Sequence, residues 1–289
     1  MDVRALLMGI AFAVMWSSAF TSARIIVADA PPLSALSVRF LISGLIAVAI
    51  ARVLGQSWRL SRDQWKATFV FGLCQNALYL GLNFLAMQWV EAGLAAIIAS
   101  TMPLLVAVIG FAGYGERLSP IGFVGVVAGV VGVALIMTTR LSGGADMVGV
   151  LCCAIGVIAL TIATLSVRNA SSGGNVLMIV GLQMLIGSLA LAGFVVSTED
   201  LIVTPSWTLA IAFVYTTLVP GLAATWVWFK LVQRIGAVRA ATFHFLNPFL
   251  GVAIAALILG ESLGVLDLVG VAIITAGILA VQMSRISKS

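Results

Sequence analysis

Charged residues are scarce in this chain of 289 residues, of which 9% are Asp, Glu, Lys or Arg and 62% are hydrophobic. In soluble domains about a quarter of the residues are charged and about half are apolar. The mean hydropathy is +1.20. This composition excludes a soluble globular protein and indicates an all-α integral membrane protein, because a lipid bilayer must cover so much apolar surface.

Groups that usually perform catalysis or hold metals are also few. His244 is the one histidine, and the three cysteines, Cys74, Cys152 and Cys153, all lie inside apolar runs. No pair of acids lies within an apolar run, and no nucleophile motif occurs. We therefore expect no catalytic site, no metal site and no cofactor, and we interpret the cysteines as reduced packing residues.

Ten apolar runs reach the roughly 20 residues that a helix needs to cross the hydrocarbon core. We predict ten transmembrane helices, at about 4–27, 32–54, 66–88, 92–112, 119–139, 147–168, 175–196, 207–230, 237–259 and 264–284. The first run is too long for a cleaved signal peptide, and only Arg4 and Asp2 precede it, so we expect it to be retained.

The 15 Lys and Arg residues form no dense patch, which argues against a nucleic-acid partner despite a formal charge of +5. If both termini are cytoplasmic, every cation except Arg24, Arg39 and Arg140 falls on the cytoplasmic side. Cytoplasmic loops of membrane proteins are enriched in cations. We therefore predict a multi-pass plasma membrane protein with both termini in the cytoplasm.

Two stretches of the sequence recur at a fixed separation. Pro248 follows Pro103 by 145 residues, and the segment Gly260-Glu261-Ser262-Leu263 follows Gly115-Glu116-Arg117-Leu118 by the same number. Gly125 and Gly132 recur as Gly270 and Gly277. The repeating unit therefore contains five spans, and we place the two copies at residues 1–141 and 142–289.

An odd number of spans makes the second copy begin on the opposite side of the membrane, so we expect two inverted five-helix repeats. Inverted repeats let one fold adopt outward-open and inward-open forms around a site near the middle of the membrane. A duplication that only records how the gene grew is the alternative. The pattern favours a transporter of a small molecule that works by alternating access.

The segment Pro103-Leu104-Leu105 to Ser119-Pro120, with the glycine-rich run after it, resembles the signature of the EamA-type drug/metabolite transporters. The second copy, Pro248 to Leu263, is similar to the same signature, and Trp16-Ser17-Ser18-Ala19-Phe20 resembles the family's first span. The resemblance covers the whole chain. It implies a bacterial inner-membrane protein with a central cavity made by spans 1–4 and 6–9.

Polar residues inside the spans are the candidates for substrate binding, because hydrocarbon tolerates them only at a cavity or a partner helix. Asn76, Tyr79 and Asn83 share one face of span 3, where cavity lining and amide packing are both open. The full set of predicted substrate-binding residues is Trp16, Ser17, Asn76, Tyr79, Asn83, His244 and Asn247.

Prolines inside three spans are candidate gates. Pro103, Pro220 and Pro248 each remove a backbone hydrogen bond, and the resulting kinks are either purely structural or part of a gate. Trp226 and Trp228 suit a belt at the membrane interface. We expect Arg24 and Arg39, at the outer ends of spans 1 and 2, to snorkel, to pair with Asp29 or to meet a carboxylate.

All ten acids lie near the ends of spans, whereas ion-coupled carriers commonly place an acid within the membrane. The predicted spans also hold no cluster of cations for a phosphate. We therefore predict transport of amphipathic metabolites, most specifically export of aromatic or hydrophobic amino acids as in the family's aromatic amino acid exporters. The alternatives are a proton-coupled drug/metabolite exporter using His244, a membrane enzyme and a passive channel; the oligomeric state stays open.

Overall fold

The computed structural model describes residues 2–114, 119–142, 144–166, 173–235, 240 and 242–286. These residues form helices and no strands. The helices pack into two compact units, and each unit draws on both halves of the sequence. Unit 1 comprises Met1–Thr21, Trp89–Val150 and Ala223–Ser289, and unit 2 comprises Ser22–Gln88 and Leu151–Leu222.

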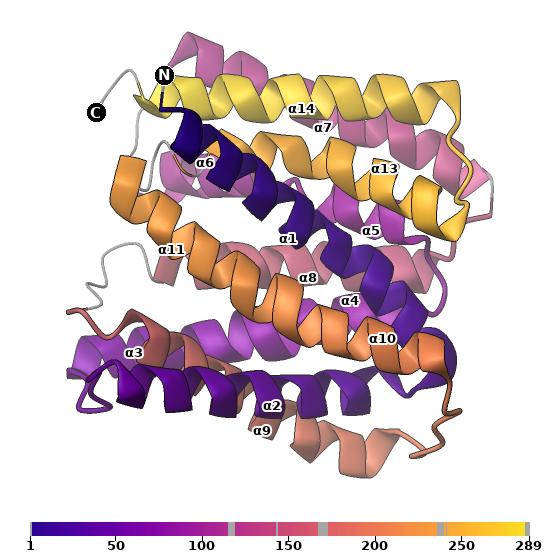
Figure 1. The fold of residues 1–289 in the computed structure, drawn as a ribbon. Helices are drawn as coiled ribbons and strands as arrows, with labels where there is room; N and C mark the ends of the chain where they lie inside the picture. Colours follow the sequence, from indigo (N-terminus) through magenta and orange to yellow (C-terminus); the bar gives the residue numbers. More distant parts are fainter. Residues whose placement is uncertain are drawn as a thin grey trace. The chain divides into compact units, whose positions relative to one another are not determined.

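Each unit is a bundle of long apolar helices (Figure 1). Unit 1 holds the first part of α1 (Val3–Asp29), α5 (Ala92–Ala99), α6 (Met102–Tyr114), α7 (Pro120–Ser142), α11 (Ala224–Ile235), η3 (Thr242–Leu246), α13 (Asn247–Leu259) and α14 (Val265–Ile286). Unit 2 holds the rest of α1, α2 (Pro32–Val53), α3 (Arg62–Phe71), η1 (Gly72–Tyr79), α4 (Leu80–Ala86), most of α8 (Met147–Ser166), α9 (Val176–Thr198), α10 (Trp207–Thr216) and most of η2 (Thr217–Ala223).

Nine helical stretches among the described residues are long and apolar enough to cross a membrane, which agrees with nine of the ten predicted spans. The described part of the remaining span is shorter, at Phe243–Leu259. Glu116, which belongs to the first copy of the repeated signature, lies outside the described residues.

In unit 1, α7 and α14 lie against each other along their length (Figure 1). A methyl group added to Gly125 would lie 2.6 Å from the carbonyl oxygen of Gly277, and one added to Gly132 would lie 2.9 Å from that of Gly270. The two helices are therefore antiparallel, and each glycine meets the repeat counterpart of the other. Such close approach requires glycine, and small residues at the contact are how helices associate in lipid.

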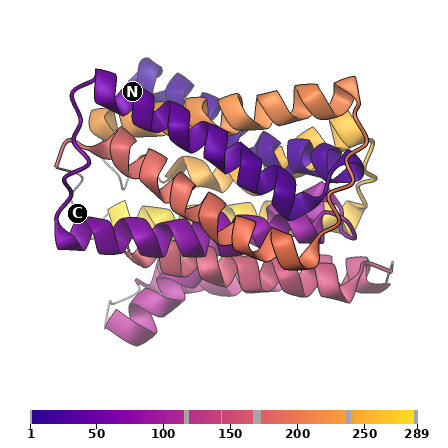
Figure 2. The same ribbon diagram turned by 90° about the horizontal axis from the view of Figure 1, so that it is seen from below.

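In unit 2, α2 and α9 are likewise an antiparallel pair in close contact. Figure 2 shows them side by side from below. Between the two helices, Ser37 Oγ donates to the carbonyl of Ser188, and Ser188 Oγ donates to the carbonyl of Ser37. At one end Gln56 Oε1 accepts a bond from the Met178 N–H at 3.0 Å. At the other end Glu199 accepts from the Leu33 N–H at 2.8 Å. The first turn of each helix therefore donates to a side chain that follows the last turn of the other helix.

Two π-helical segments interrupt spans of unit 2. One is η1 in span 3 and the other is η2 in span 8, and their first residues, Gly72 and Thr217, are 145 residues apart. A π-helical turn carries an extra residue and is frequent at functional sites. These irregularities therefore occupy equivalent positions of the two sequence copies.

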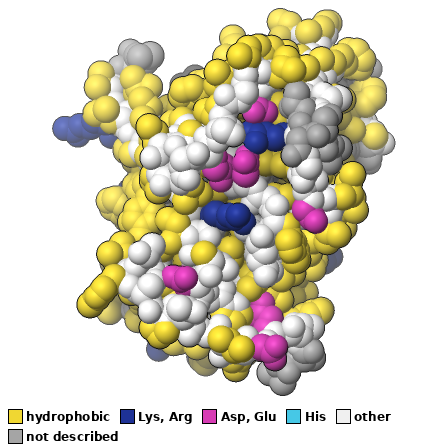
Figure 3. Space-filling view, turned by 90° about the vertical axis from the view of Figure 1, so that its right-hand side faces the viewer, with side chains coloured by type: hydrophobic (Ala, Val, Ile, Leu, Met, Phe, Trp, Pro, Cys, Tyr) yellow, Lys and Arg dark blue, Asp and Glu magenta, His cyan; other side chains and the backbone are white. Residues whose placement is uncertain are grey.

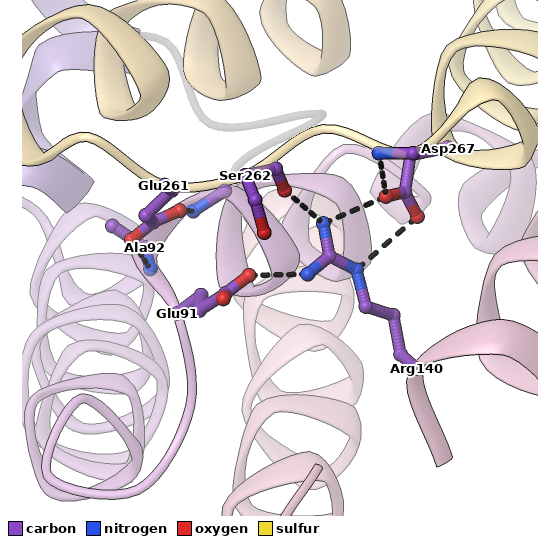
Figure 4. Close-up of polar contacts among 8 residues, drawn as sticks. Glu91, Ala92, Arg140, Glu261, Ser262 and Asp267 are labelled. Carbon is purple, nitrogen blue, oxygen red and sulfur yellow. Dashed lines mark hydrogen bonds and ion pairs between the residues drawn. The ribbon is translucent and has the colours of Figure 1, made fainter. Parts of the chain in front are cut away.

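The Gly-Glu pair of the repeated signature has a structural role in unit 1. Gly260 ends α13 with φ +69°, a left-handed conformation that glycine adopts without steric cost. The chain then turns so that Glu261 accepts bonds from the N–H groups of Ala92 at 2.7 Å and Gly93 at 2.9 Å (Figure 4). A carboxylate at this position satisfies two free donors of α5 and complements the positive end of the helix.

Glu261→Ala is expected to lower the free energy of unfolding by about 1–2 kcal/mol, because both N–H groups at the start of α5 lose their acceptor. Glu261→Gln, which retains one acceptor oxygen, should lose about half as much. Asp200→Ala removes an acid from an exposed position and serves as the control. Thermal unfolding in detergent measures the three variants, and an equal loss in Glu261→Ala and Asp200→Ala would contradict the capping role.

An ion network lies beside this cap, at the same end of unit 1. Arg140, from the end of α7, forms ion pairs with Glu91 and Asp267 and lies 3.4 Å from the carbonyl oxygen of Ser262 (Figure 4). Figure 3 looks onto this end of the helices and shows acidic and basic side chains in contact. One guanidinium therefore joins the start of α5, the end of α7 and the connection between α13 and α14.

Candidate functional site

Four rings gather in unit 1 around the single histidine. The ring centroid of His244 lies 5.2 Å from that of Trp228, 5.3 Å from that of Phe12 and 6.3 Å from that of Trp16. Phe12 also lies 4.8 Å from Trp228 and 5.7 Å from Trp16. We call Phe12, Trp16, Trp228 and His244 the aromatic cluster; its edge-to-face contacts with His244 are a favourable geometry for aromatic rings.

Polar atoms extend the aromatic cluster at one side. The side-chain nitrogen Nδ2 of Asn247 lies 2.9 Å from Nδ1 of His244, and Ser17 Oγ donates to Asn247 Oδ1 at 3.5 Å. With the amide donating to Nδ1, a neutral imidazole carries its proton on Nε2 and keeps one N–H donor. The cluster therefore combines an apolar aromatic surface with a hydroxyl, an amide and an imidazole.

The backbone beneath the cluster is a broken helix. His244 lies in η3, a short 3-10 turn, and Pro248 is the second residue of α13. At the start of a helix the missing N–H of proline leaves no hydrogen bond broken. Pro103 has the same place in α6, directly after the interruption that separates α6 from α5, so the two prolines sit at helix breaks rather than at kinks in continuous helices.

The structure thus brings four predicted binding residues together, namely Trp16, Ser17, His244 and Asn247. Phe12 was not predicted, although its position four residues before Trp16 places both on one face of α1. Trp228 was predicted to belong to an interface belt and instead packs on Phe12 and His244. Trp226 is 55% exposed, which suits a belt.

The other three predicted binding residues lie in unit 2, where Asn76, Tyr79 and Asn83 are each 2% exposed. Asn76 Nδ2 donates to the Gln183 carbonyl in α9 at 2.9 Å, and Asn83 Nδ2 donates to the Tyr79 carbonyl at 2.8 Å. The Asn76 bond joins span 3 to α9, whereas the Asn83 bond stays within span 3. The carbonyl oxygen of the Asn83 side chain has no hydrogen-bond partner, so the part of Asn83 in binding stays a prediction.

Pro220 lies inside η2, the π-helical segment of span 8. A proline inside a helix removes a backbone hydrogen bond and clashes with the preceding turn, and the wider π-helical turn accommodates both effects. Pro220 therefore lies at an irregularity of the backbone of unit 2. Its action as a gate stays a prediction, as it does for Pro103 and Pro248.

Arg39 is a buried cation, which contradicts the expectation that it snorkels from the outer end of span 2. It lies seven residues into α2, about 10 Å along the helix axis at 1.5 Å per residue, and its exposure is only 5%. Neither Arg24 nor Arg39 pairs with Asp29: Arg24 donates to the Met87 carbonyl, and Asp29 accepts a bond from Ser206 Oγ at 2.6 Å. The useful signal was the depth of Arg39 in the apolar run, since side chains at helix ends snorkel and deeper ones cannot.

Membrane-length helices, breaks before paired prolines and polar side chains inside the spans define a multi-pass membrane transporter. The model of the EamA-like transporter family matches residues 3–138 and again 147–283. The chain therefore belongs to the EamA-like transporter family, and it is not an enzyme.

Several relatives that match along most of the chain are named as transporters. The "Uncharacterized transporter YvbV" of Bacillus subtilis is 27% identical over 93% of this chain and 88% of that protein. The "Uncharacterized inner membrane transporter YedA" of Escherichia coli K12 is 25% identical over 94% of this chain and 88% of that protein. A crystal structure with 19% sequence identity matches 98% of each chain with a TM-score of 0.71, which supports the fold alone.

Proposed function

We propose that the protein exports small amphipathic metabolites, with aromatic and other hydrophobic amino acids as its favoured substrates. The aromatic cluster carries this proposal. Its rings form an apolar aromatic patch, and Ser17, Asn247 and His244 add a hydroxyl, an amide and an imidazole beside it. A mainly apolar site with a few fixed polar groups suits a ligand that has an apolar body and a polar end.

Transport by alternating access between two inverted repeats, residues 1–141 and 142–289, is part of the proposal. Features about 145 residues apart support it: the helix breaks at Pro103 and Pro248, the π-helical segments η1 and η2, and the crosswise glycines of α7 and α14. Broken helices in corresponding places of two repeats are typical of transporters.

In this proposal the protein lies in a bacterial inner membrane, and both of its termini face the cytoplasm. The name of the Escherichia coli relative assigns that protein to the inner membrane. The charge pattern supports the orientation, because 12 of the 15 cations lie at the ends or in the loops that this orientation makes cytoplasmic.

Energy for export comes, in this proposal, from the gradient of the substrate itself. The described acids that contact other groups lie near helix ends, among them Asp29, Glu91, Glu199, Glu261 and Asp267. Uptake into proteoliposomes should therefore continue without a pH gradient. Uptake that strictly requires the gradient would instead support proton coupling, with His244 as the titrating group.

The test of the function is a proteoliposome assay of the full chain with L-Phe, L-Trp, L-Tyr, L-Met and L-Thr. We expect saturable uptake and counterflow of preloaded substrate, which a passive channel cannot produce. Trp16→Ala should lower the rate about tenfold, because a central aromatic contact is lost, and Trp226→Ala, at an exposed position, should not. His244→Ala should reduce uptake as well.

No uptake of any of the five amino acids by the wild-type chain would overturn the substrate assignment. Equal rates in Trp16→Ala and Trp226→Ala would overturn the assignment of the aromatic cluster. The thermal unfolding midpoint of each variant separates a loss of transport from a loss of folded protein.

A further inference from the structure

Arg39 is a buried cation of unit 2 that forms no ion pair with any residue the structure describes. Its guanidinium belongs to a side chain that is 5% exposed, and its Nε has no hydrogen-bond partner. Among the described residues the ion pairs join Arg140 to Glu91 and Asp267, and Arg234 to Asp2, and none includes Arg39. A buried arginine ordinarily pairs with an anion or donates to carbonyl groups.

Two acids of unit 2, Asp29 and Glu199, already bind other groups. Asp29 accepts from Ser206 Oγ at 2.6 Å, and Glu199 accepts from the N–H groups of Leu33 and Ser34, each at 2.8 Å. Both acids stabilise helix starts and the connection that precedes α10. Neither is therefore free to neutralise Arg39 without giving up these bonds.

The irregular backbone of η2 lies next to the guanidinium. A methyl group added to Gly221 would lie 3.5 Å from one terminal nitrogen of Arg39 and 3.5 Å from Ser43 Oγ. Ser43 Oγ in turn donates to the Thr217 carbonyl at 3.5 Å. The same methyl group at Gly221 would lie 3.1 Å from the Thr216 carbonyl oxygen, so glycine lets the backbone of η2 approach the cation closely. A π-helical segment of this kind is frequent at functional sites.

An aromatic side chain completes these surroundings. The central carbon of the Arg39 guanidinium lies 5.2 Å from the ring centroid of Phe40. The five N–H groups of arginine form a planar fork that matches the two oxygens of a carboxylate. A carboxylate is therefore a partner whose planar shape and charge fit the guanidinium.

We propose that Arg39 binds the carboxylate of the transported molecule, with Ser43 beside it, and so restricts the substrates to amphipathic carboxylates and zwitterions. This inference rests on the proposed function, because it names the chemical class of the molecules that the transporter carries. Amines and amides of the same apolar shape lack the anion that Arg39 requires.

The experiment compares three probes on the full chain in proteoliposomes: L-phenylalanine, L-phenylalaninamide, in which the carboxylate is an amide, and 3-phenylpropionate, which keeps the carboxylate and lacks the amine. Binding is measured as competition with a fluorescent aromatic carboxylate and as a shift of the thermal midpoint. We expect the wild-type chain to prefer both carboxylates over the amide at least about tenfold.

Arg39→Gln should abolish this preference, so that the carboxylate and the amide bind within about twofold of each other, whereas Arg39→Lys should retain part of it. Arg24→Gln is the matched control: Arg24 also lies in a span of unit 2, donates to the Met87 carbonyl and should leave the preference unchanged. If Arg39→Gln does not fold, the comparison of Arg39→Lys with the wild type decides the result.

The two proposals fail in different ways. A carboxylate preference that persists in Arg39→Gln and Arg39→Lys overturns the role of Arg39, even when the wild-type chain transports L-phenylalanine. Loss of carboxylate binding in Arg39→Gln supports that role even if none of the five amino acids is transported, and in that case the choice of amino acids as substrates is what fails.

Discussion

Gly277→Leu is expected to lower the free energy of unfolding by about 3 kcal/mol and to reduce the yield of folded protein sharply. A side chain at Gly277 would place its first carbon 2.6 Å from the Gly125 carbonyl oxygen and 2.9 Å from the backbone nitrogen of Gly129. Both contacts are with backbone, so no change of rotamer relieves them. The helices α7 and α14 must move apart, and the contact between small residues that holds them together is lost.

The control is Gly193→Leu, at a glycine of α9 that has no other atom within 4 Å of the added carbon. Leucine favours a helix by about 1 kcal/mol over glycine, so this variant should unfold at the same or a higher temperature. The unfolding midpoint of Gly270→Leu is expected to lie between those of the other two variants, because the closest contact of the added carbon is the flexible side chain of Ile136. Thermal unfolding in detergent ranks the three, and equal midpoints for Gly277→Leu and Gly193→Leu would contradict the close helix contact.

The spans and the paired glycines were predictable because they are properties of composition and spacing. A run of apolar residues predicts a membrane helix from its length alone, and Gly125 and Gly132 recur as Gly270 and Gly277 at a constant separation. Their crosswise contact was not predictable, because spacing does not tell which helices pack together. The π-helical segments η1 and η2 also escaped prediction, since they arise from packing and carry no sequence pattern of their own.

In the candidate site, too, residue spacing predicts contacts within one span but not contacts between spans. Helical periodicity correctly put His244 and Asn247 on one side of a span, and their contact at 2.9 Å agrees with it. Ser17 is 230 positions away from Asn247, so only the fold shows that their side chains meet. The depth of Arg39 in its apolar run can be read from the sequence. Its contact with the neighbouring η2 cannot, because one run does not show which helix packs against it.

For Asn76 the sequence predicts which face of span 3 carries the side chain, but it does not predict what that side chain binds. The spacing of Asn76, Tyr79 and Asn83 predicted that they share a side of span 3, and all three are buried. Periodicity does not say whether that side meets a ligand or a helix, and Asn76 donates to the carbonyl of Gln183 in α9. Polar groups in hydrocarbon need partners of either kind, so amide packing was equally compatible with the pattern.

Arg140→Met is expected to lower the free energy of unfolding by about 2 kcal/mol, because it leaves the Asp267 carboxylate buried without a cation. The side chain of Asp267 is 7% exposed and that of Glu91 is 40% exposed, so most of the loss should come from Asp267. Methionine keeps much of the length and apolar contact of arginine. The change therefore isolates the charge, and thermal unfolding in detergent measures its effect.

The double variant Arg140→Met with Asp267→Asn identifies the cause of that loss. Asp267 accepts a hydrogen bond from the Gly264 N–H at 3.0 Å. Asparagine keeps an oxygen that can accept this bond and carries no charge that must be buried. It should restore about half of the stability lost in Arg140→Met. Arg234→Met, which breaks the exposed pair with Asp2, should cause no measurable loss. Failure of the asparagine to restore stability would show that Arg140 acts through its packing rather than by neutralising Asp267.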